Sequence, residues 1–313
     1  MMKSAIDIGT NTVLLLVAEK EQGDIRVIEE QQRVPRLGRN VDEQRNLPDE
    51  AMGRVIDILK EYQHIIDRKY PDAGPPVVTA TSAVRDANNR DEFIDRVEEQ
   101  TGLRVTILSG LEEAACTFLG AQSVLPGVPR DQLKIVLDIG GGSTEIALGK
   151  EAEIMDRYSF DMGCVRFTER YLKDIPATPG QINDCKKAIR EVLAEYPYDL
   201  EDDIRLVGVS GTVTSLVYID RDLTAYDNDG INGCRLSAGA IRDYISIFRS
   251  ATPDELTRRY PVVMEGRADI FLAGLLILEG VMDLYGFGSL IASTGGIRHG
   301  AVLLEGSLNK KSP

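Results

Sequence analysis

Residues 133–145, LKIVLDIGGGSTE, decide the fold. An apolar run rich in β-branched residues ends at Asp138, a glycine turn follows, and a second run begins at Thr144. This order predicts a buried strand, a tight turn and an antiparallel strand. Residues 5–18, AIDIGTNTVLLLVA, repeat it, with Asp7 131 positions before Asp138. The strand–Asp-Ile-Gly–strand unit is therefore present twice.

Each copy opens a longer stretch in which strands and helices alternate. In the first half, the pattern predicts strands at 5–8, 13–18, 26–32, 76–80 and 104–108, with a turn at 22–24. It predicts helices from Pro48, from the end of strand 76–80 to Gln100, and from Ser109 to about residue 122.

The second half follows the same plan. Strands are expected at 133–138, 144–148, 153–159, 204–209 and 289–292. Helices are expected over 268–284 and from Thr178 and Thr252, where TPGQ and TPDE have capping-box spacing. Two α/β halves built alike would bury their sheets under helices and leave a cleft between them. The expected domains are 1–125 and 126–313, and the last helix is free to return to the first.

Composition limits the possible functions. The 313-residue chain is 43% hydrophobic and 27% charged, which is typical of a globular protein with two domains. No apolar run approaches the ~18 residues of a membrane span, and the N-terminus lacks a signal-peptide core, so we expect a cytoplasmic protein. The net charge of −14 argues against nucleic acid as a partner. A polyanionic substrate would need local arginines, backbone amides and a metal.

Cysteine and histidine usage narrows the metal chemistry. Cys116, Cys164, Cys185 and Cys234 are widely spaced and form no CxxC pair, so reduced thiols are expected. His64 and His299 are the only histidines, which excludes His-rich metal sites and points to a carboxylate as general base. The metal that suits such a chain is Mg²⁺ or Mn²⁺.

The two glycine turns are candidate phosphate clamps. A short turn containing glycine lets several backbone N–H groups converge on an anion, because no Cβ blocks the approach. Each turn follows an aspartate at a strand end, where Asp7 and Asp138 would aim at a metal. The alternative is a pair of plain hairpins with solvated aspartates.

A third candidate anion site is the strand-to-helix junction at Ser210-Gly211-Thr212. A rival reading takes Ser210, Asp227 and His299 as a serine hydrolase triad in α/β-hydrolase order. Residues 208–212, GVSGT, lack the last glycine of a nucleophile elbow, which disfavours this reading.

Six ordered motifs resemble the exopolyphosphatase/guanosine pentaphosphate phosphohydrolase (PPX/GppA) family: DIGTNT at 7–12, TATSAVRDA at 79–87, LSGLEEA at 108–114, DIGGGSTE at 138–145, GVSGT at 208–212 and GGIR at 295–298. The resemblance implies a duplicated actin/Hsp70/sugar-kinase-like (ribonuclease H-like) fold. It also implies Mg²⁺-dependent release of terminal phosphate from polyphosphate, or of the 5′ γ-phosphate from pppGpp. The chain looks like the short two-domain form, which favours short polyphosphates or a nucleotide over long chains as substrate.

Glu113 is the expected catalytic residue. A positioned carboxylate takes the proton of water as it attacks phosphorus. Spacing alone favours a solvated acid in the first turn of a helix. The resemblance assigns catalysis to Glu113 and leaves Glu112 as the capping-box partner of Ser109.

The remaining roles follow from charge and position. Asp138 and Glu145, on either side of the second turn, are expected to hold the metal together with Asp7, although Glu145 also fits an exposed strand position. Arg85 is expected to bind phosphate through its fork, with a salt bridge to Asp86 or Asp91 as the alternative. The full set of expected phosphate-binding residues is Gly9, Thr10, Asn11, Thr12, Arg36, Arg85, Gly140, Gly141, Gly142, Ser143, Ser210, Gly211, Thr212 and Arg298.

Three further residues are weaker candidates or depart from the family pattern. Arg39 and Arg267 are basic residues in or near these motifs, and Arg267 equally fits a pair with Asp269 or Glu265. His299 departs from the family, where an acidic residue commonly follows the arginine, and is expected at the surface.

Competing functions are a pppGpp 5′-phosphohydrolase, an ATP-dependent kinase on the same scaffold, and a non-catalytic polyphosphate or alarmone sensor. The sequence does not indicate an oligomeric state, and a homodimer is compatible with it.

Overall fold

The computed structural model describes residues 1–21, 23–196 and 204–308; Gln22, in the expected turn, lies outside them. The chain divides into two compact units. The first unit is Met1–Val124 with Gly295–Pro313, and the second unit is Leu125–Thr294. A search of the described residues found no helix with the length and hydropathy of a membrane span.

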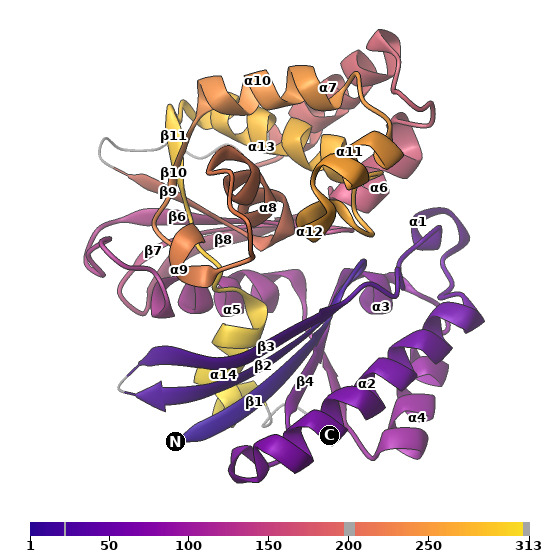
Figure 1. The fold of residues 1–313 in the computed structure, drawn as a ribbon, viewed down its shortest axis with the longest axis vertical. Coiled ribbons are helices and arrows are strands. Elements are labelled where there is room, and N and C mark those ends of the chain that lie inside the picture. Colours follow the sequence, from indigo (N-terminus) through magenta and orange to yellow (C-terminus); the bar gives the residue numbers. More distant parts are fainter. Residues whose placement is uncertain (22, 197–203, 309–313) are drawn as a thin grey trace. The chain divides into compact units, whose positions relative to one another are not determined.

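The first unit contains a five-stranded mixed sheet of order β3-β2-β1-β4-β5 (Figure 1). Its strands are β1 (Met2–Ile8), β2 (Val13–Glu21), β3 (Asp24–Arg33), β4 (Val77–Ala80) and β5 (Val105–Ile107). The first three strands form an antiparallel meander, and β4 runs parallel to β1. Because β1 is central, Asp7 near its end is carried on a strand whose last five residues are all buried.

Helices cover both faces of this sheet. They are α1 (Val41–Gln44), α2 (Asp49–Lys69), the 3₁₀ turn η1 (Pro71–Ala73), α3 (Ser82–Asp86), α4 (Arg90–Thr101), α5 (Gly110–Ser123) and α14 (Ile297–Leu308). One core joins the sheet to α2 and α4 through residues such as Leu15, Leu59 and Phe93. The opposite face packs on α14 and α5, through Leu16, Cys116 and other apolar side chains.

The contact between α5 and α14 is a close backbone approach. A Cβ at Gly120 of α5 would overlap the carbonyl oxygen of Gly296, and one at Gly300 of α14 would overlap that of Cys116. Only glycine leaves room for helices this near. The chain's last helix therefore fixes the position of α5, the helix that carries Glu113.

The second unit repeats the sheet order of the first. Its strands are β6 (Lys134–Ile139), β7 (Thr144–Lys150), β8 (Glu153–Phe160), β9 (Arg205–Val209), β10 (Arg235–Ser237) and β11 (Ser289–Ala292). Their order, β10-β11-β9-β6-β7-β8, matches the first sheet with β10 added at one edge. The register shift at Val17/Ala18 in the first meander recurs at Leu148/Gly149 in the second. The expected duplicated α/β fold is confirmed.

Helices of the second unit bury one face of its sheet. They are α6 (Cys164–Tyr171), α7 (Pro179–Leu193), α8 (Ser210–Asp220), α9 (Asn228–Ile231), α10 (Ala238–Phe248), α11 (Pro253–Arg259), α12 (Pro261–Met264) and α13 (Phe271–Tyr285). Both expected capping boxes, at Thr178 and Thr252, are present. The core against β6 draws mainly on α6, α7, α8, α10 and α13.

One expected helix was wrong. The pattern predicted a single helix from the end of strand 76–80 to Gln100, but the structure has α3 and α4 with a break between them. Asn89 exchanges two hydrogen bonds with the backbone of Leu47, at 2.8 and 3.0 Å, and the amide of Asn88 donates to the Arg45 carbonyl at 2.7 Å. These bonds to a distant segment hold residues 87–89 out of a helix, which local spacing does not reveal.

Candidate functional site

The expected site residues lie in both units. The first unit carries Asp7, Gly9, Thr10, Asn11, Thr12, Arg36, Arg85, Glu113 and Arg298, and the second carries Asp138, Gly140, Gly141, Gly142, Ser143, Glu145, Ser210, Gly211 and Thr212.

The two glycine turns have one backbone geometry. We call Gly9–Thr12 the first turn and Gly140–Ser143 the second turn. In each, the amide of the leading glycine donates to the carbonyl three residues on, at 2.9 Å in the first turn and 3.0 Å in the second. Within the described part of the chain, no acceptor is found for the amides of Thr10 and Thr12, or for those of Gly141, Gly142 and Ser143. Such a set of amides is the donor array that an anion requires.

The carbonyls of both turns, by contrast, are engaged. In the first turn, the amide of Gly38 donates to Thr10 at 2.8 Å and that of Arg36 donates to Asn11 at 3.1 Å. Arg36 itself adopts a left-handed conformation, with φ of 54°. The 36–38 segment thus holds the first turn by its oxygens and leaves the N–H groups of Thr10 and Thr12 for another partner.

The second turn stands beside two buried carboxylates. Asp138 and Glu145 are directly opposite each other in the β6–β7 pair, so their side chains share one face of the sheet. Glu145 is 2% exposed, so the alternative of an exposed strand residue is wrong. Ser210 donates a hydrogen bond to Asp138, and Ser159 donates one to Glu145 at 2.7 Å. Each carboxylate is therefore oriented by a hydroxyl group.

This donor set fits Mg²⁺ or Mn²⁺. Mg²⁺ prefers oxygen ligands and usually binds through one or two carboxylates, with waters and substrate phosphates completing its shell. Asp138 and Glu145 supply the two carboxylates. A fully protein-made cage is not present among residues 1–21, 23–196 and 204–308, where no cluster of three or more acidic, histidine or cysteine side chains is arranged for a metal.

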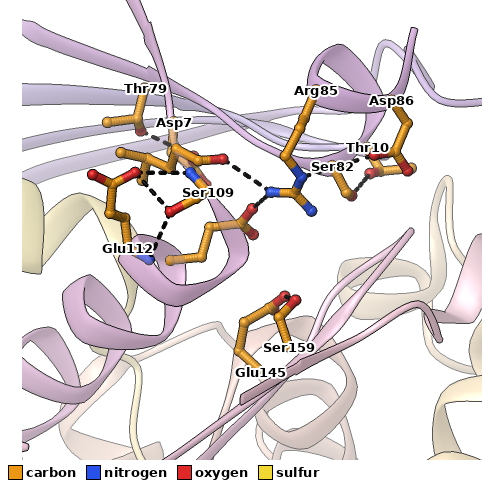
Figure 2. A network of polar contacts seen from close by, with 12 residues as sticks. Asp7, Thr10, Thr79, Ser82, Arg85, Asp86, Ser109, Glu112, Glu145 and Ser159 are labelled. Carbon is orange, nitrogen blue, oxygen red and sulfur yellow. Dashed lines mark hydrogen bonds and ion pairs between the residues drawn. The ribbon is translucent and has the colours of Figure 1, made fainter. Parts of the chain in front are cut away.

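The first unit has a different polar network around its turn (Figure 2). Thr79 on β4 donates to Asp7 at 3.1 Å, and the hydroxyls of Thr10 and Ser82 share a hydrogen bond of 2.9 Å. Asp7 is opposite Leu14 in the β1–β2 pair. The first unit thus offers one carboxylate where the second offers two.

Arg85 and Glu113 form an ion pair, although 28 positions separate them in the sequence. The same Arg85 nitrogen, Nη1, donates to the carbonyl of Leu108 at 3.0 Å, just before α5 begins. The expected alternative partner Asp86 lies 3.8 Å from Arg85 Nε. Arg85 therefore ties α3 to the first turn of α5 and orients the Glu113 carboxylate.

Glu113 is not a solvated helix-terminal acid. Its exposed fraction is 2%, so the alternative of a solvent-facing residue stabilised only by the helix dipole is wrong. The capping box assigned to Glu112 is present, since Ser109 and Glu112 exchange hydrogen bonds of 2.9 and 3.3 Å. The two adjacent glutamates thus have different roles: Glu112 caps the start of α5, and the side chain of Glu113 is buried.

Residues 298–299 differ from expectation at one position. Arg298 pairs with Glu30 of β3, its Nε lying 3.2 Å from the carboxylate. His299 was expected at the surface and is instead fully buried, with 0% exposure. Its Nδ1 accepts the amide of Gly296 at 3.3 Å, and burial lowers the pKa of His299 to about 3. The Nε2 atom of His299 lies 3.9 Å from the Glu30 carboxylate of β3.

The third candidate anion site contains a cation that spacing did not assign. Ser210 opens α8 in a left-handed conformation, with φ of 65°, and its hydroxyl donates to Asp138. The guanidinium of Arg267 lies directly against the Cα of Gly211 and donates to Ser215 at 3.0 Å. Burial lowers the pKa of Arg267. The serine hydrolase reading is not supported, because Ser210 has Asp138 as its acceptor.

Three further residues around the site had no strong sequence signal. Ser159 donates a hydrogen bond to Glu145, 14 positions away in the sequence, and Arg166 donates one to Gly142 of the second turn, 24 positions away. Arg267 contacts Gly211 across 56 positions. Two sequence signals were available. Arg267 lies in a segment that resembles the family, and Arg166 follows shortly after the third strand of the second copy of the repeat.

The chain is similar in sequence and structure to known proteins of one family. The model of the Ppx/GppA phosphatase family matches residues 16–308. The chain is 32% identical to a bifunctional 3-dehydroquinate synthase/phosphatase of Fusobacterium nucleatum over 99% of this chain and 47% of that protein, so it spans about half of that relative. It is 33% identical to exopolyphosphatase 2 of Mycobacterium tuberculosis over 88% of both chains. The crystal structure of a family member from Aquifex aeolicus matches with a TM-score of 0.81, at 29% identity, covering 100% of this chain and 99% of that one.

Proposed function

The chain belongs to the Ppx/GppA phosphatase family, and from this premise we propose that it releases terminal phosphate from inorganic polyphosphate in a Mg²⁺-dependent hydrolysis. The observation that carries the proposal is the pair of matched turns, in which the amides of Thr10 and Thr12 and those of residues 141–143 have no acceptor among the described residues. Two such donor arrays suit a substrate made of linked phosphate groups. The name of the M. tuberculosis relative supports the same substrate class.

The proposed reaction assigns one task to each group. Water attacks the terminal phosphorus while Glu113 accepts one of its protons, and the bond from phosphorus to the bridging oxygen breaks. The electron pair of that bond stays on the bridging oxygen, so the products are orthophosphate and a chain shortened by one unit. The turn amides, with Arg36, Arg85, Arg298 and residues 210–212, hold the phosphoryl oxygens. Asp138 and Glu145, with Asp7 as the weaker candidate, would hold Mg²⁺, which neutralises charge on those oxygens.

The Arg85–Glu113 ion pair gives the proposal a specific form. The pair positions the carboxylate before substrate arrives, and one guanidinium fork has enough donors to bind a phosphoryl oxygen as well. A general base placed in this way typically contributes ~10²–10⁴-fold to the rate.

A matched assay tests the substrate. Phosphate release is measured from tripolyphosphate, longer polyphosphate and pppGpp at equal concentration of phosphoanhydride, with Mg²⁺, with Mn²⁺ and with EDTA. We expect turnover of polyphosphate that EDTA abolishes and that added Mg²⁺ restores. Faster turnover of pppGpp would assign the chain to the nucleotide instead, and binding without turnover would make it a sensor. Phosphorylation of an acceptor by ATP, without polyphosphate hydrolysis, would support the kinase alternative.

A further inference from the structure

We infer that Arg166 is a positioning residue that sets the orientation of the second turn, and so governs how the turn's amides bind phosphate. The inference rests on the proposed function for the role of the turn. It concerns a residue with no part in the reaction described above. Its basis is a set of hydrogen bonds from α6 to the turn's carbonyl oxygens.

Arg166 is an almost fully buried cation, 6% exposed, in the first turn of α6. Its Nε–H donates to the carbonyl of Gly142 at 2.6 Å. Its backbone amide also donates, to the carbonyl of Gly141 at 3.1 Å. One residue thus holds two consecutive peptide groups of the turn.

The first residues of α6 hold the rest of the turn. The amide of Cys164 donates to Gly140 at 2.9 Å, and that of Val165 donates to Gly141 at 2.8 Å. Gly163 allows this approach, because a Cβ there would overlap the carbonyl oxygen of Gly141. The carbonyl oxygens of three successive glycines, residues 140–142, therefore all accept hydrogen bonds from α6.

This arrangement decides where the amides point. A peptide group is planar, so its N–H and C=O point in opposite directions. Fixing the carbonyl of Gly141 directs the amide of Gly142, and fixing the carbonyl of Gly142 directs the amide of Ser143. Neither amide has an acceptor within the described residues. Arg166 therefore controls two of the donors that would meet a phosphoryl oxygen.

The first turn shows that the side-chain bond is not a general need of the repeat. There, the position equivalent to Gly142 is Asn11, whose carbonyl accepts the backbone amide of Arg36. In the second unit a buried guanidinium takes over that role. A buried charge is costly to place and would not be expected where a backbone amide is sufficient.

The test separates the geometry of Arg166 from its charge. Arg166→Lys keeps the charge but has no planar N–H at the Nε position, and Arg166→Met removes both. Arg170→Met is the matched control, since it removes an exposed arginine one turn later on the same helix. KM and kcat for tripolyphosphate and the unfolding midpoint in urea are measured for each. We expect both Arg166 variants to lose ~10–100-fold in kcat/KM, mainly through KM, as for other residues that orient ligands.

A second pair of variants tests the turn without touching Arg166. Cys164→Pro removes the amide that donates to Gly140, at the first helical position, where proline is tolerated after the extended Gly163. Cys164→Ala keeps that amide. We expect a raised KM for the proline variant only. Hydrogen exchange of the peptide spanning 140–143 should be faster in Arg166→Lys and Cys164→Pro than in the Arg170→Met and Cys164→Ala controls.

The outcomes separate a failure of the proposed function from a failure of the role inferred for Arg166. Wild-type protein that hydrolyses no phosphoanhydride would remove the proposed function, while the exchange data would still report on the turn. An active wild type with an Arg166→Lys variant of unchanged KM and unchanged exchange would overturn the inference. So would losses that follow only the unfolding midpoint, because those indicate a purely structural residue.

Discussion

The two glycine turns share a backbone and differ in the charges beside them. The residue paired with the aspartate across the hairpin is Glu145 in the second unit, opposite Asp138, and Leu14 in the first unit, opposite Asp7. The first unit has instead the Arg85–Glu113 ion pair at the start of α5. Duplication has kept the sheet order and the turn, while the ionisable side chains have diverged.

This difference indicates a division of labour. Two carboxylates on one sheet face suit a metal, whereas a single carboxylate held by an arginine suits proton transfer. The second turn would then carry the metal, and the first unit would carry the general base.

The largest effect is expected at Glu113. Glu113→Gln keeps the side-chain shape and removes the proton acceptor, so kcat for polyphosphate should fall by at least ~100-fold. The affinity for tripolyphosphate, measured by calorimetry, should change little. Glu112→Gln is the control, because Glu112 serves the capping box, and it should affect the unfolding free energy more than the rate. Full activity in Glu113→Gln would remove the base from the first unit.

The metal should depend on the second unit more than on the first. Asp138→Asn and Glu145→Gln are expected to lose ~10–100-fold in activity, with higher Mg²⁺ needed for half-maximal rate. Asp7→Asn should lose less and should leave the Mg²⁺ requirement nearly unchanged, since Leu14 opposite it offers no second ligand. Equal Mg²⁺ shifts in Asp7→Asn and Asp138→Asn would show that both units hold the metal.

Most of the scaffold was predictable because its signals are local. Strand ends fell within a few residues of the expected positions, and the capping boxes at Ser109, Thr178 and Thr252 are all present. The family and the enzyme class, a phosphoanhydride hydrolase, are confirmed by the family match. These features depend on residues a few positions apart, or on motifs read in order along the chain.

The side-chain partners were not predictable, because they join distant segments. Nothing near Arg85 in the sequence indicates Glu113 as its partner, and nothing near His299 indicates that its side chain is buried. The break between α3 and α4 likewise depends on Leu47. The roles of the phosphate-binding residues, the interdomain cleft and the domain boundary at 125/126 stay predictions.

The glycines that admit the supporting segments should differ in tolerance. A Cβ at Gly38 would meet the methyl group of Thr10, which has some freedom to turn, whereas one at Gly163 would meet the backbone oxygen of Gly141. Overpacking costs ~1–3 kcal/mol, and we expect Gly163→Ala near the upper end and Gly38→Ala near the lower. Urea unfolding measures both. A larger loss at Gly38 would indicate that the first turn, rather than the second, is the less adaptable.

The smallest effect concerns α14, which supports the base-carrying helix of the first unit, and it is seen as a change in pH dependence. The pKa of buried His299 is about 3 in the folded chain, below its ordinary value of 6.5, so between these limits the unfolded chain binds a proton that the folded chain does not. Unfolding free energy should therefore decrease as pH falls below ~6.5, by up to about 1.4 kcal/mol per pH unit from this group.

His299→Asn keeps an acceptor for the Gly296 amide and does not titrate. Urea unfolding between pH 7 and 5 should show a shallower decrease in this variant than in the wild type, whatever its stability at pH 7. His64→Asn, at an exposed position on α2, is the matched control substitution. The window ends at pH 5 so that carboxylates contribute little. Identical slopes in the wild type and His299→Asn would mean that His299 takes up its proton at the same pH in the folded and unfolded chains, with Glu30, 3.9 Å away, as the nearby acid.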